Sequence, residues 1–238
     1  MNRDILDTLL QARRQGTACA LVRNLKYGDQ TIVFSDKTIG TLEITSSLKS
    51  TVLEAISEDR SGRLEAPNED LFVQVLNPPM RLIVVGAVHI AQALAPMAVL
   101  AGYAVTVIDP RRAFATDQRF PGVTLLQEWP DDGLEALKPD RRTAVVTLTH
   151  DPKLDDAALS VALKSHCFYV GSLGSKKTHL ARTNRLRRLG FAEAELGRIH
   201  GPVGLSIGAL TPAEIALAIM AQITQVRRQA PARMGAAA

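Results

Sequence analysis

Residues 81–91 constrain the fold of this chain more than any other stretch. Residues 82–85 are apolar without alternation, which is typical of a strand that helices bury on both faces. Gly86 then predicts a tight turn, and the small and apolar residues that follow it recur at helical spacing. A second apolar strand over 104–108 completes a strand–helix–strand unit. The stretch therefore predicts a Rossmann-like α/β fold, with a parallel sheet and helices on both of its faces.

The same unit carries part of a dinucleotide-binding fingerprint. Gly86, Val88 and Ala91 occupy the three fingerprint positions, and Asp109 stands where such folds place a ribose-binding carboxylate. The second glycine is missing, and the branched side chain of Val88 keeps the backbone from approaching a pyrophosphate closely. The pattern favours the fold more strongly than it favours NAD(P), and an NAD(P)-dependent oxidoreductase stays as the alternative function.

Two domains and a tail are predicted from the 238 residues. The first part indicates a small α+β module with helices over 4–14 and 48–57 and strands over 18–22, 31–34, 38–44 and 71–75. Asn77-Pro-Pro is the expected linker. The predicted divisions are an N-terminal module over 1–76, a Rossmann-like domain over 80–228 and a flexible tail over 229–238.

Strands and helices continue to alternate after Asp109. We expect strands at 123–126, 143–148 and 168–170, and helices near 133–137, 155–163, 177–189 and 192–196. Asp155 is the predicted N-cap of its helix, and a glycine-rich loop is predicted over 198–208. Thr211 and Glu214 form a capping box that starts the last helix.

Composition limits the classes of partner and compartment. The net charge of +4 is modest and acidic residues are spread throughout, so a solvated surface is favoured over nucleic-acid binding. Cys19 and Cys167 have no metal-ligand spacing and apolar neighbours, which fits a reducing compartment. The start of the chain lacks a signal-sequence pattern, and no apolar run is long enough for a membrane span. We expect a cytoplasmic protein that neither spans a membrane nor binds nucleic acid.

A glycine-rich segment over 171–177 is the best candidate for an anion site. It follows a strand and opens a helix, so its backbone amides and the positive end of the helix point at the same place. The candidate residues in this segment are Gly171, Ser172, Gly174, Ser175 and Lys176. Arg111 is a further candidate for a phosphate clamp. The spacing is too short for a Walker A loop, and an ordinary strand-to-helix turn is the alternative.

Three histidines stand at strand ends or glycine turns, namely His89, His150 and His200. They would converge over one sheet edge if the strands are parallel, with Asp109 and Asp151 nearby. No His-x-x-x-His pair is present, so a metal stays an open question and hydrogen-bonded structural roles are the alternative. The glycine-rich loop with Gly204 indicates a ligand or a tight backbone contact. No nucleophile elbow is present.

At these residues the chain resembles the XdhC/CoxI family, the accessory proteins that mature xanthine and carbon-monoxide dehydrogenases. The resembling segments cover roughly residues 81–226. They are Gly86-Ala-Val-His89, Ile108-Asp-Pro-Arg111, Arg119-Phe-Pro121, Leu148-Thr-His-Asp151 with Lys153-Leu-Asp155, Gly171-Ser-Leu-Gly-Ser175, and Ile199-His-Gly-Pro-Val-Gly-Leu205 running into Thr211-Pro-Ala-Glu-Ile-Ala216. Their joint order makes the resemblance specific.

The resemblance implies a protein that binds the molybdenum cofactor, protects it during terminal sulfuration and passes it to an apo-dehydrogenase. The implied partners are an apo molybdenum hydroxylase of the xanthine dehydrogenase type and a cysteine desulfurase or other sulfur donor, and a homodimer is expected. This favours a non-catalytic chaperone over an enzyme, with a docking adaptor as a further alternative. The implied cofactor-binding residues are Gly86, His89, Asp109, Arg111, His150, Asp151, Gly171, Ser172, Gly174, Ser175, Lys176, His200 and Gly204. The 171–177 segment and Arg111 suit the phosphate, and His150 and His200 suit the pterin or the metal's oxo ligands.

One position and one segment depart from the family's pattern. Val88 replaces the second glycine of Gly-Ala-Gly-His, and Glu43-Ile-Thr-Ser-Ser-Leu48 stands where relatives have Gly-Gly-Gly-Cys-Val-Glu. If relatives use that cysteine to bind molybdenum or relay sulfur, this chain must work otherwise, rely on a partner, or be a diverged branch.

Overall fold

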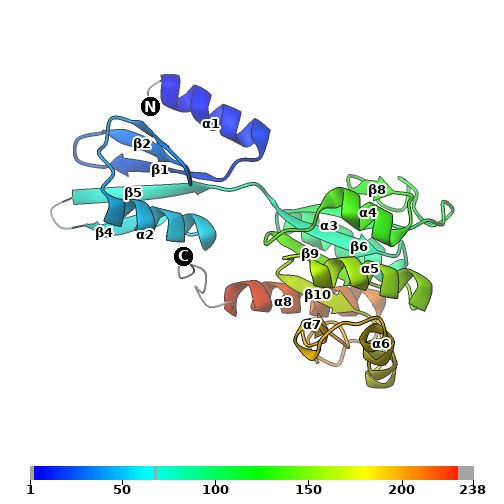
Figure 1. Ribbon diagram of the computed structural model, residues 1–238. Helices are drawn as coiled ribbons and strands as arrows, with labels where there is room; N and C mark the ends of the chain where they lie inside the picture. The colour runs from blue at the N-terminus through cyan, green and yellow to red at the C-terminus, as the bar shows by residue number, and fades with distance from the viewer. Residues whose placement is uncertain (1–2, 67–68, 230–238) are drawn as a thin grey trace. The chain divides into compact units, whose positions relative to one another are not determined.

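Contacts between residues divide the chain at two adjacent prolines. One unit extends up to Pro78, and a larger unit begins at Pro79. The structure is a computed structural model that describes residues 3–66 and 69–229 (Figure 1). The tail predicted over 229–238 lies outside these residues except for Gln229, which ends the last helix.

The N-terminal unit is a five-stranded antiparallel sheet with one helix on each face. The strand order is β3-β2-β1-β5-β4. The elements are α1 (Arg3–Gln15), β1 (Cys19–Asn24), β2 (Gln30–Val33), β3 (Thr38–Gly40), α2 (Ser46–Ser57), β4 (Gly62–Ala66) and β5 (Glu69–Leu76). Ile5 of α1 packs with Leu21 on one face, and Val52 of α2 packs with Val22 on the other. Successive side chains of β1 therefore point to opposite faces of the sheet and belong to two hydrophobic cores, one under each helix.

Two details of this unit differ from the sequence-based prediction. The third strand ends at Gly40 and does not reach residue 44; Gly40 has a φ of +152° and a Cβ there would lie 2.5 Å from Cα of Thr31, so only glycine fits this position. Strand β4 is not among the strands predicted from the sequence. It pairs antiparallel with the next strand in the chain, β5, from Gly62 opposite Val73 to Ala66 opposite Glu69, and its glycine, alanine and charged residues are not typical of a strand.

The larger unit is a six-stranded sheet in which every neighbouring pair is parallel. The order is β11-β10-β9-β6-β7-β8. The strands are β6 (Met80–Val85), β7 (Tyr103–Ile108), β8 (Thr124–Leu126), β9 (Thr143–Thr147), β10 (Tyr169–Ser172) and β11 (Ile199–His200). The strand order reverses between β6 and β9, and this is where open α/β sheets bind ligands. The predicted Rossmann-like fold is confirmed.

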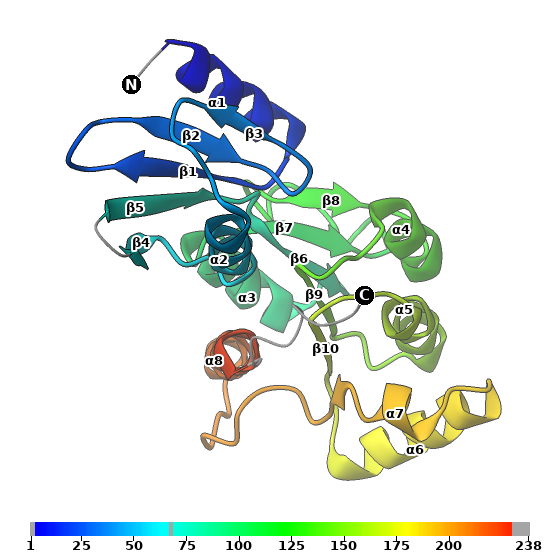
Figure 2. The ribbon, with the colours of Figure 1, turned by 60° about the vertical axis from the view of Figure 1, so that its left-hand side comes forward.

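Helices cover both faces of this sheet. They are α3 (His89–Leu100), α4 (Pro130–Leu137), α5 (Pro152–Lys164), α6 (Lys176–Arg188), α7 (Glu193–Leu196) and α8 (Pro212–Gln229). Figure 2 shows α3 and α8 on one side of the sheet and α4 and α5 on the other. In β6, Leu82 and Val84 face the α3 and α8 layer, whereas Ile83 and Val85 face the α5 layer. Burial on both faces explains why this strand is apolar at every position.

The sequence-based predictions of the helix caps were wrong for α5 and right for α8. The N-cap of α5 is Asp151, whose side chain accepts a hydrogen bond from the amide of Lys153 at 2.9 Å. The prediction that Asp155 is the cap was wrong, because Pro152 already begins the helix and Asp155 is buried within it. The capping box of α8 is confirmed: the amide of Thr211 donates to Glu214 at 2.9 Å, and the amide of Glu214 donates to the hydroxyl of Thr211 at 3.3 Å.

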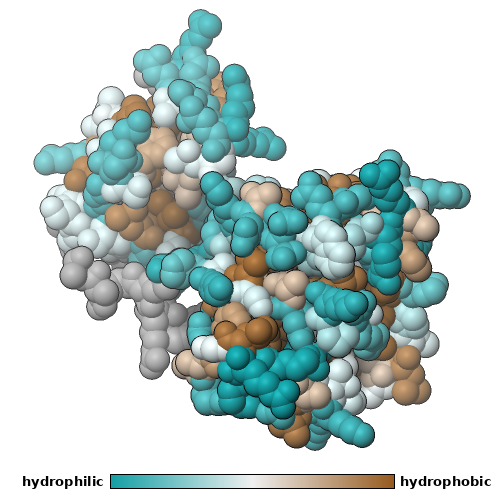
Figure 3. All heavy atoms as spheres, turned by 45° about the vertical axis from the view of Figure 1, so that its right-hand side comes forward, coloured by the Kyte–Doolittle hydropathy of each residue, from teal (hydrophilic) through white to brown (hydrophobic). Residues whose placement is uncertain are grey.

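Hydrophobic and hydrophilic side chains both occur on the surface. On the face that Figure 3 presents, hydrophobic residues form small patches between hydrophilic ones, which is ordinary for a surface in contact with water. Across 3–66 and 69–229, no helix combines the length and apolar character needed to cross a membrane.

Candidate binding site at the carboxyl edge of the parallel sheet

The thirteen residues expected from the sequence all lie at or just beyond the carboxyl ends of five parallel strands. Gly86 and His89 follow β6, and Asp109 and Arg111 follow β7. The others are His150 and Asp151 after β9, Gly171 and Ser172 at the end of β10 with Gly174, Ser175 and Lys176 beyond it, and His200 at the end of β11 with Gly204 beyond it. Because parallel strands end at the same edge, the fold brings these segments to one side of the sheet.

Asp109 and Arg111 form an ion pair with two hydrogen bonds at this edge. Arg111 donates from Nε to Oδ1 of Asp109 at 2.8 Å and from Nη2 to Oδ2 at 2.7 Å. The carboxylate also accepts from the amides of Ala87 at 2.8 Å and of Arg111 at 3.0 Å. Burial alone would raise the pKa of Asp109, but these hydrogen bonds outweigh it and hold the pKa below its usual value. The guanidinium of Arg111 also stacks over Phe114, 4.5 Å from the ring centre.

This bonding occupies groups that a dinucleotide would need. Asp109 is fully buried, and each of its oxygens already accepts two hydrogen bonds. The amide of Ala87, in the turn where a pyrophosphate would approach, donates to Asp109. Asp109 therefore fixes the turn and orients Arg111, and the carboxylate does not face an incoming ribose.

The turn after β6 packs directly against the loop after β9. Gly86 has a φ of +107°, and a Cβ there would lie 2.7 Å from Cγ2 of Thr149. Glycine is thus required both for conformation and for space. His150, the next residue in that loop, is exposed and has a left-handed φ of +62°. Few residues other than glycine adopt this conformation, and those that do are found at functional sites more often than elsewhere.

The predicted anion segment consists of a buried part and an exposed part. Gly171 and Ser172 lie inside the sheet: a Cβ at Gly171 would lie 2.6 Å from Val203, and the Ser172 hydroxyl is 2.5 Å from that of Thr147. Gly174, with a φ of +141°, turns the chain into α6. Ser175 caps that helix by accepting from the amide of Thr178 at 3.1 Å. Helix α6 therefore begins at exposed Lys176.

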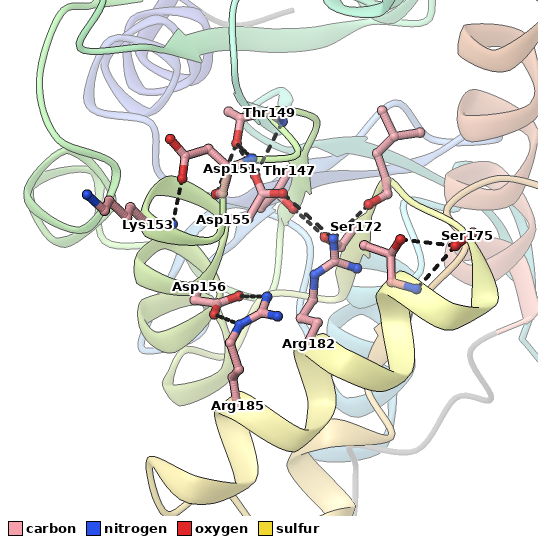
Figure 4. Close-up of polar contacts among 12 residues, drawn as sticks. Thr147, Thr149, Asp151, Lys153, Asp155, Asp156, Ser172, Ser175, Arg182 and Arg185 are labelled. Carbon is pink, nitrogen blue, oxygen red and sulfur yellow. Dashed lines mark hydrogen bonds and ion pairs between the residues drawn. The ribbon is translucent and has the colours of Figure 1, made fainter.

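A buried ion pair beneath this edge was not predicted from the sequence (Figure 4). Asp155 and Arg182 have side chains that are each 2% exposed, with Oδ2 and Nη2 3.7 Å apart. Nη2 of Arg182 also donates to the carbonyl of Leu173 at 2.7 Å. Among the described residues, Nε and Nη1 of Arg182 have no hydrogen-bond partner. Burial raises the pKa of Asp155 and lowers that of Arg182. No local pattern in the sequence signals this pairing between α5 and α6.

His200 and Gly204 are held by contacts with β10 and α8. The His200 ring stacks on Tyr169 with ring centres 4.7 Å apart and planes at 9°. The Tyr169 hydroxyl donates to Oε1 of Gln222 at 2.6 Å, and the amide of Gly204 donates to the same oxygen at 2.8 Å. Burial lowers the pKa of His200, which favours the neutral imidazole. The stretch predicted as a loop contains the short strand β11, which includes His200.

The histidines do not assemble a metal site in the described part of the chain. There, no group of three or more histidine, cysteine, aspartate or glutamate side chains lies close enough to hold a metal ion. His89 is exposed at the first position of α3, and His150 is exposed in the loop before α5. Both cysteines are buried, and burial raises the pKa of each thiol.

Comparisons with known proteins agree with one another. The XdhC Rossmann domain family matches residues 82–223. The uncharacterized protein YqeB of Escherichia coli strain K12 is 32% identical over 182 residues, which cover 75% of this chain and 32% of YqeB. A protein of Bacillus subtilis strain 168, described as a probable subunit of xanthine dehydrogenase, is 32% identical over 161 residues, covering 67% of this chain and 47% of that protein.

Another curated relative and one crystal structure are also similar to this chain. The molybdenum cofactor insertion chaperone PaoD of Escherichia coli strain K12 is 31% identical over 150 residues, covering 63% of this chain and 41% of PaoD. The crystal structure of a xanthine dehydrogenase from Bacillus halodurans matches with 25% identity and a TM-score of 0.75, covering 99% of this chain and 66% of that one. The chain spans less than half the length of the three curated relatives.

Proposed function

Because the chain belongs to the XdhC family, we propose that it binds the molybdenum cofactor and delivers it to an apo molybdoenzyme of the xanthine dehydrogenase type. The names of two relatives support this proposal, since one is a cofactor insertion chaperone and the other is a probable subunit of xanthine dehydrogenase. We propose further that the chain supports sulfuration of the cofactor together with a cysteine desulfurase or other sulfur donor, and that it acts as a cytoplasmic homodimer.

The observation that supports the proposal is a pair of cationic side chains, Arg111 and Lys176, at the carboxyl edge of the sheet. Arg111 is oriented by Asp109, and Lys176 stands at the N-terminus of α6. A helix N-terminus and an oriented guanidinium both favour a phosphate, which the cofactor carries on its pterin. These groups fit that end of the molecule.

The metal end of the cofactor has a different requirement. Both thiols of the chain are buried with raised pKa values, so neither offers an accessible thiolate to molybdenum. When bound, the cofactor would supply its own dithiolene and oxo ligands. His150, exposed near the same edge, and His200 are the imidazoles that we assign to the pterin or those oxo ligands.

The test is equilibrium binding of the purified chain to the molybdenum cofactor and, separately, to NAD(P)H. We expect cofactor binding by the wild type, weaker binding by Lys176→Ala, and no binding of NAD(P)H. Lys164→Ala is the matched control, because Lys164 is equally a lysine on the surface but ends α5 away from the site. Equal affinity of the two variants for the molybdenum cofactor would show that Lys176 does not contribute to cofactor binding. Tight NAD(P)H binding without binding of the molybdenum cofactor would contradict the chaperone function and favour an NAD(P)-dependent oxidoreductase.

Delivery and assembly need their own measurements. Activation of a purified, cofactor-free xanthine dehydrogenase by the loaded chain tests delivery, and dependence of that activation on a cysteine desulfurase tests sulfuration. Sedimentation equilibrium tests the homodimer. Activation by free cofactor at the same rate would contradict a chaperone role.

A further inference from the structure

The two loops that border the candidate site are joined beneath the surface by one polar chain. The loop after β9 is held by Asp155, whose Oδ1 accepts from the Thr149 hydroxyl at 2.6 Å and from its amide at 3.3 Å. The loop after β10 is held by Arg182, which donates to the Leu173 carbonyl at 2.7 Å. The Asp155–Arg182 pair connects the two, as Figure 4 shows.

Stability alone does not account for this pair. Both side chains are almost fully buried, and two guanidinium nitrogens of Arg182 have no partner within the described residues. Burying such groups is costly, and apolar residues of similar volume are often as stable or more stable than a buried ion pair. A pair in this setting is therefore explained better by the geometry it imposes than by the free energy it adds.

We propose that Asp155 and Arg182 are positioning residues that fix the separation of the His150–Asp151 loop from the N-terminus of α6. The proposal rests on the proposed function, in that the ligand whose affinity depends on this separation is the molybdenum cofactor. Neither side chain touches the ligand, because both are buried beneath the loops. Residues that hold binding groups in place set affinity through geometry, and loss of such support typically weakens binding about tenfold or more.

A second ion pair between the same two helices provides the control. Asp156 and Arg185 join α5 to α6 with Nε to Oδ2 at 2.5 Å and Nη2 to Oδ1 at 3.0 Å. Both hydrogen bonds run from helix to helix, and neither loop takes part in them. The control pair therefore shares the helix contact and lacks the connection to the site.

The experiment compares Asp155→Leu/Arg182→Met with Asp156→Leu/Arg185→Met in the full chain. Measurements are the thermal midpoint, the affinity for purified molybdenum cofactor, and amide hydrogen exchange of the two loops. For the Asp155 and Arg182 variant we expect a folded protein, cofactor affinity lower by about tenfold or more, and faster exchange confined to 149–151 and 173–177. The control variant should match the wild type in affinity and loop exchange.

The outcomes separate this inference from the proposed function. Wild-type affinity and wild-type loop exchange in the Asp155 and Arg182 variant would overturn the positioning role, as would faster exchange spread over the whole unit. If the wild type binds no cofactor, the proposed function fails, and loop exchange alone decides the positioning role. Arg182→Lys keeps the charge without the planar fork, so it gives the same comparison if the double variant does not fold, with selective loosening of the loops expected.

Discussion

Arg111 binds the buried carboxylate of Asp109 side-on, with Nε 2.8 Å from Oδ1 and Nη2 2.7 Å from Oδ2. The same carboxylate accepts the amide of Ala87 at 2.8 Å, so one acidic residue joins the turn after β6 to the segment after β7. A residue that a sequence fingerprint associates with ribose thus acts here inside the protein, where it orients a cation. This has consequences for stability, for pH dependence and for nucleotide binding.

Replacing Asp109 by asparagine should destabilise the larger unit. Each carboxylate oxygen accepts two hydrogen bonds, so the amide nitrogen of asparagine would leave two of the four unmade and Arg111 without its charged partner, which costs about 2 kcal/mol in the free energy of unfolding. Urea denaturation measures this change. Asp117→Asn is the control, because Asp117 is exposed in the same connection and should shift stability by less than about 0.5 kcal/mol. Equal stability of both variants would contradict a structural role for the Asp109–Arg111 pair.

The stabilisation from Asp109 should depend on pH in a defined direction. Its folded-state pKa lies below the ordinary value of 3.8, so the unfolded chain takes up a proton first as the pH falls. The contribution is therefore complete above the unfolded-state pKa and is lost as the pH falls through the lower folded-state value. We expect the stability gap between wild type and Asp109→Asn to be constant above about pH 5 and to narrow as the pH falls from about 5 to about 3. A gap that stays constant or widens on acidification would show that the carboxylate is not stabilised in the folded state.

Gly86 should tolerate no side chain, for two separable reasons. It has a positive φ of +107°, and a Cβ would approach Cγ2 of Thr149 to 2.7 Å. Gly102 also has a positive φ, of +85°, but a Cβ there would meet nothing within 4 Å. Gly102→Ala should therefore cost about 1 kcal/mol from backbone strain, and Gly86→Ala about 3 kcal/mol from strain and overlap together. Equal losses in thermal unfolding would mean that the loop after β9 moves away freely.

The fold was predictable because its signals are local. The unbroken apolar run of β6, the glycine turn at Gly86 and the capping box at Thr211 each follow from a few adjacent residues. The short strand β11 was not predictable, since Ile199 and His200 become a strand only by pairing with β10. Pairing between distant segments decides such cases, and one sequence does not contain that information.

The candidate site was likewise predictable in part. The fold places every expected residue at the carboxyl edge of the strands, but the sequence does not distinguish residues that face outward from those that hold the edge together. Gly171 and Ser172 are examples, because they lie inside the sheet whereas Lys176 is exposed. Asp155 resembles a helix cap in the sequence, and only its distant partner Arg182 explains its burial.

Restoring the missing fingerprint glycine should not create a nucleotide site. Val88→Gly removes the branched side chain, but the Ala87 amide still donates to Asp109 and the carboxylate still has no free lone-pair direction for a ribose. A pyrophosphate needs open backbone amides at this turn, and a ribose needs an accessible carboxylate. We expect no NADH fluorescence change with either the wild type or Val88→Gly. The Val88→Gly/Arg111→Ala variant frees two of the four hydrogen bonds to Asp109, so binding that appears only there would identify the Asp109–Arg111 pair as the barrier. Binding by Val88→Gly alone would show that the valine is the barrier and that the carboxylate can rearrange to reach a ribose.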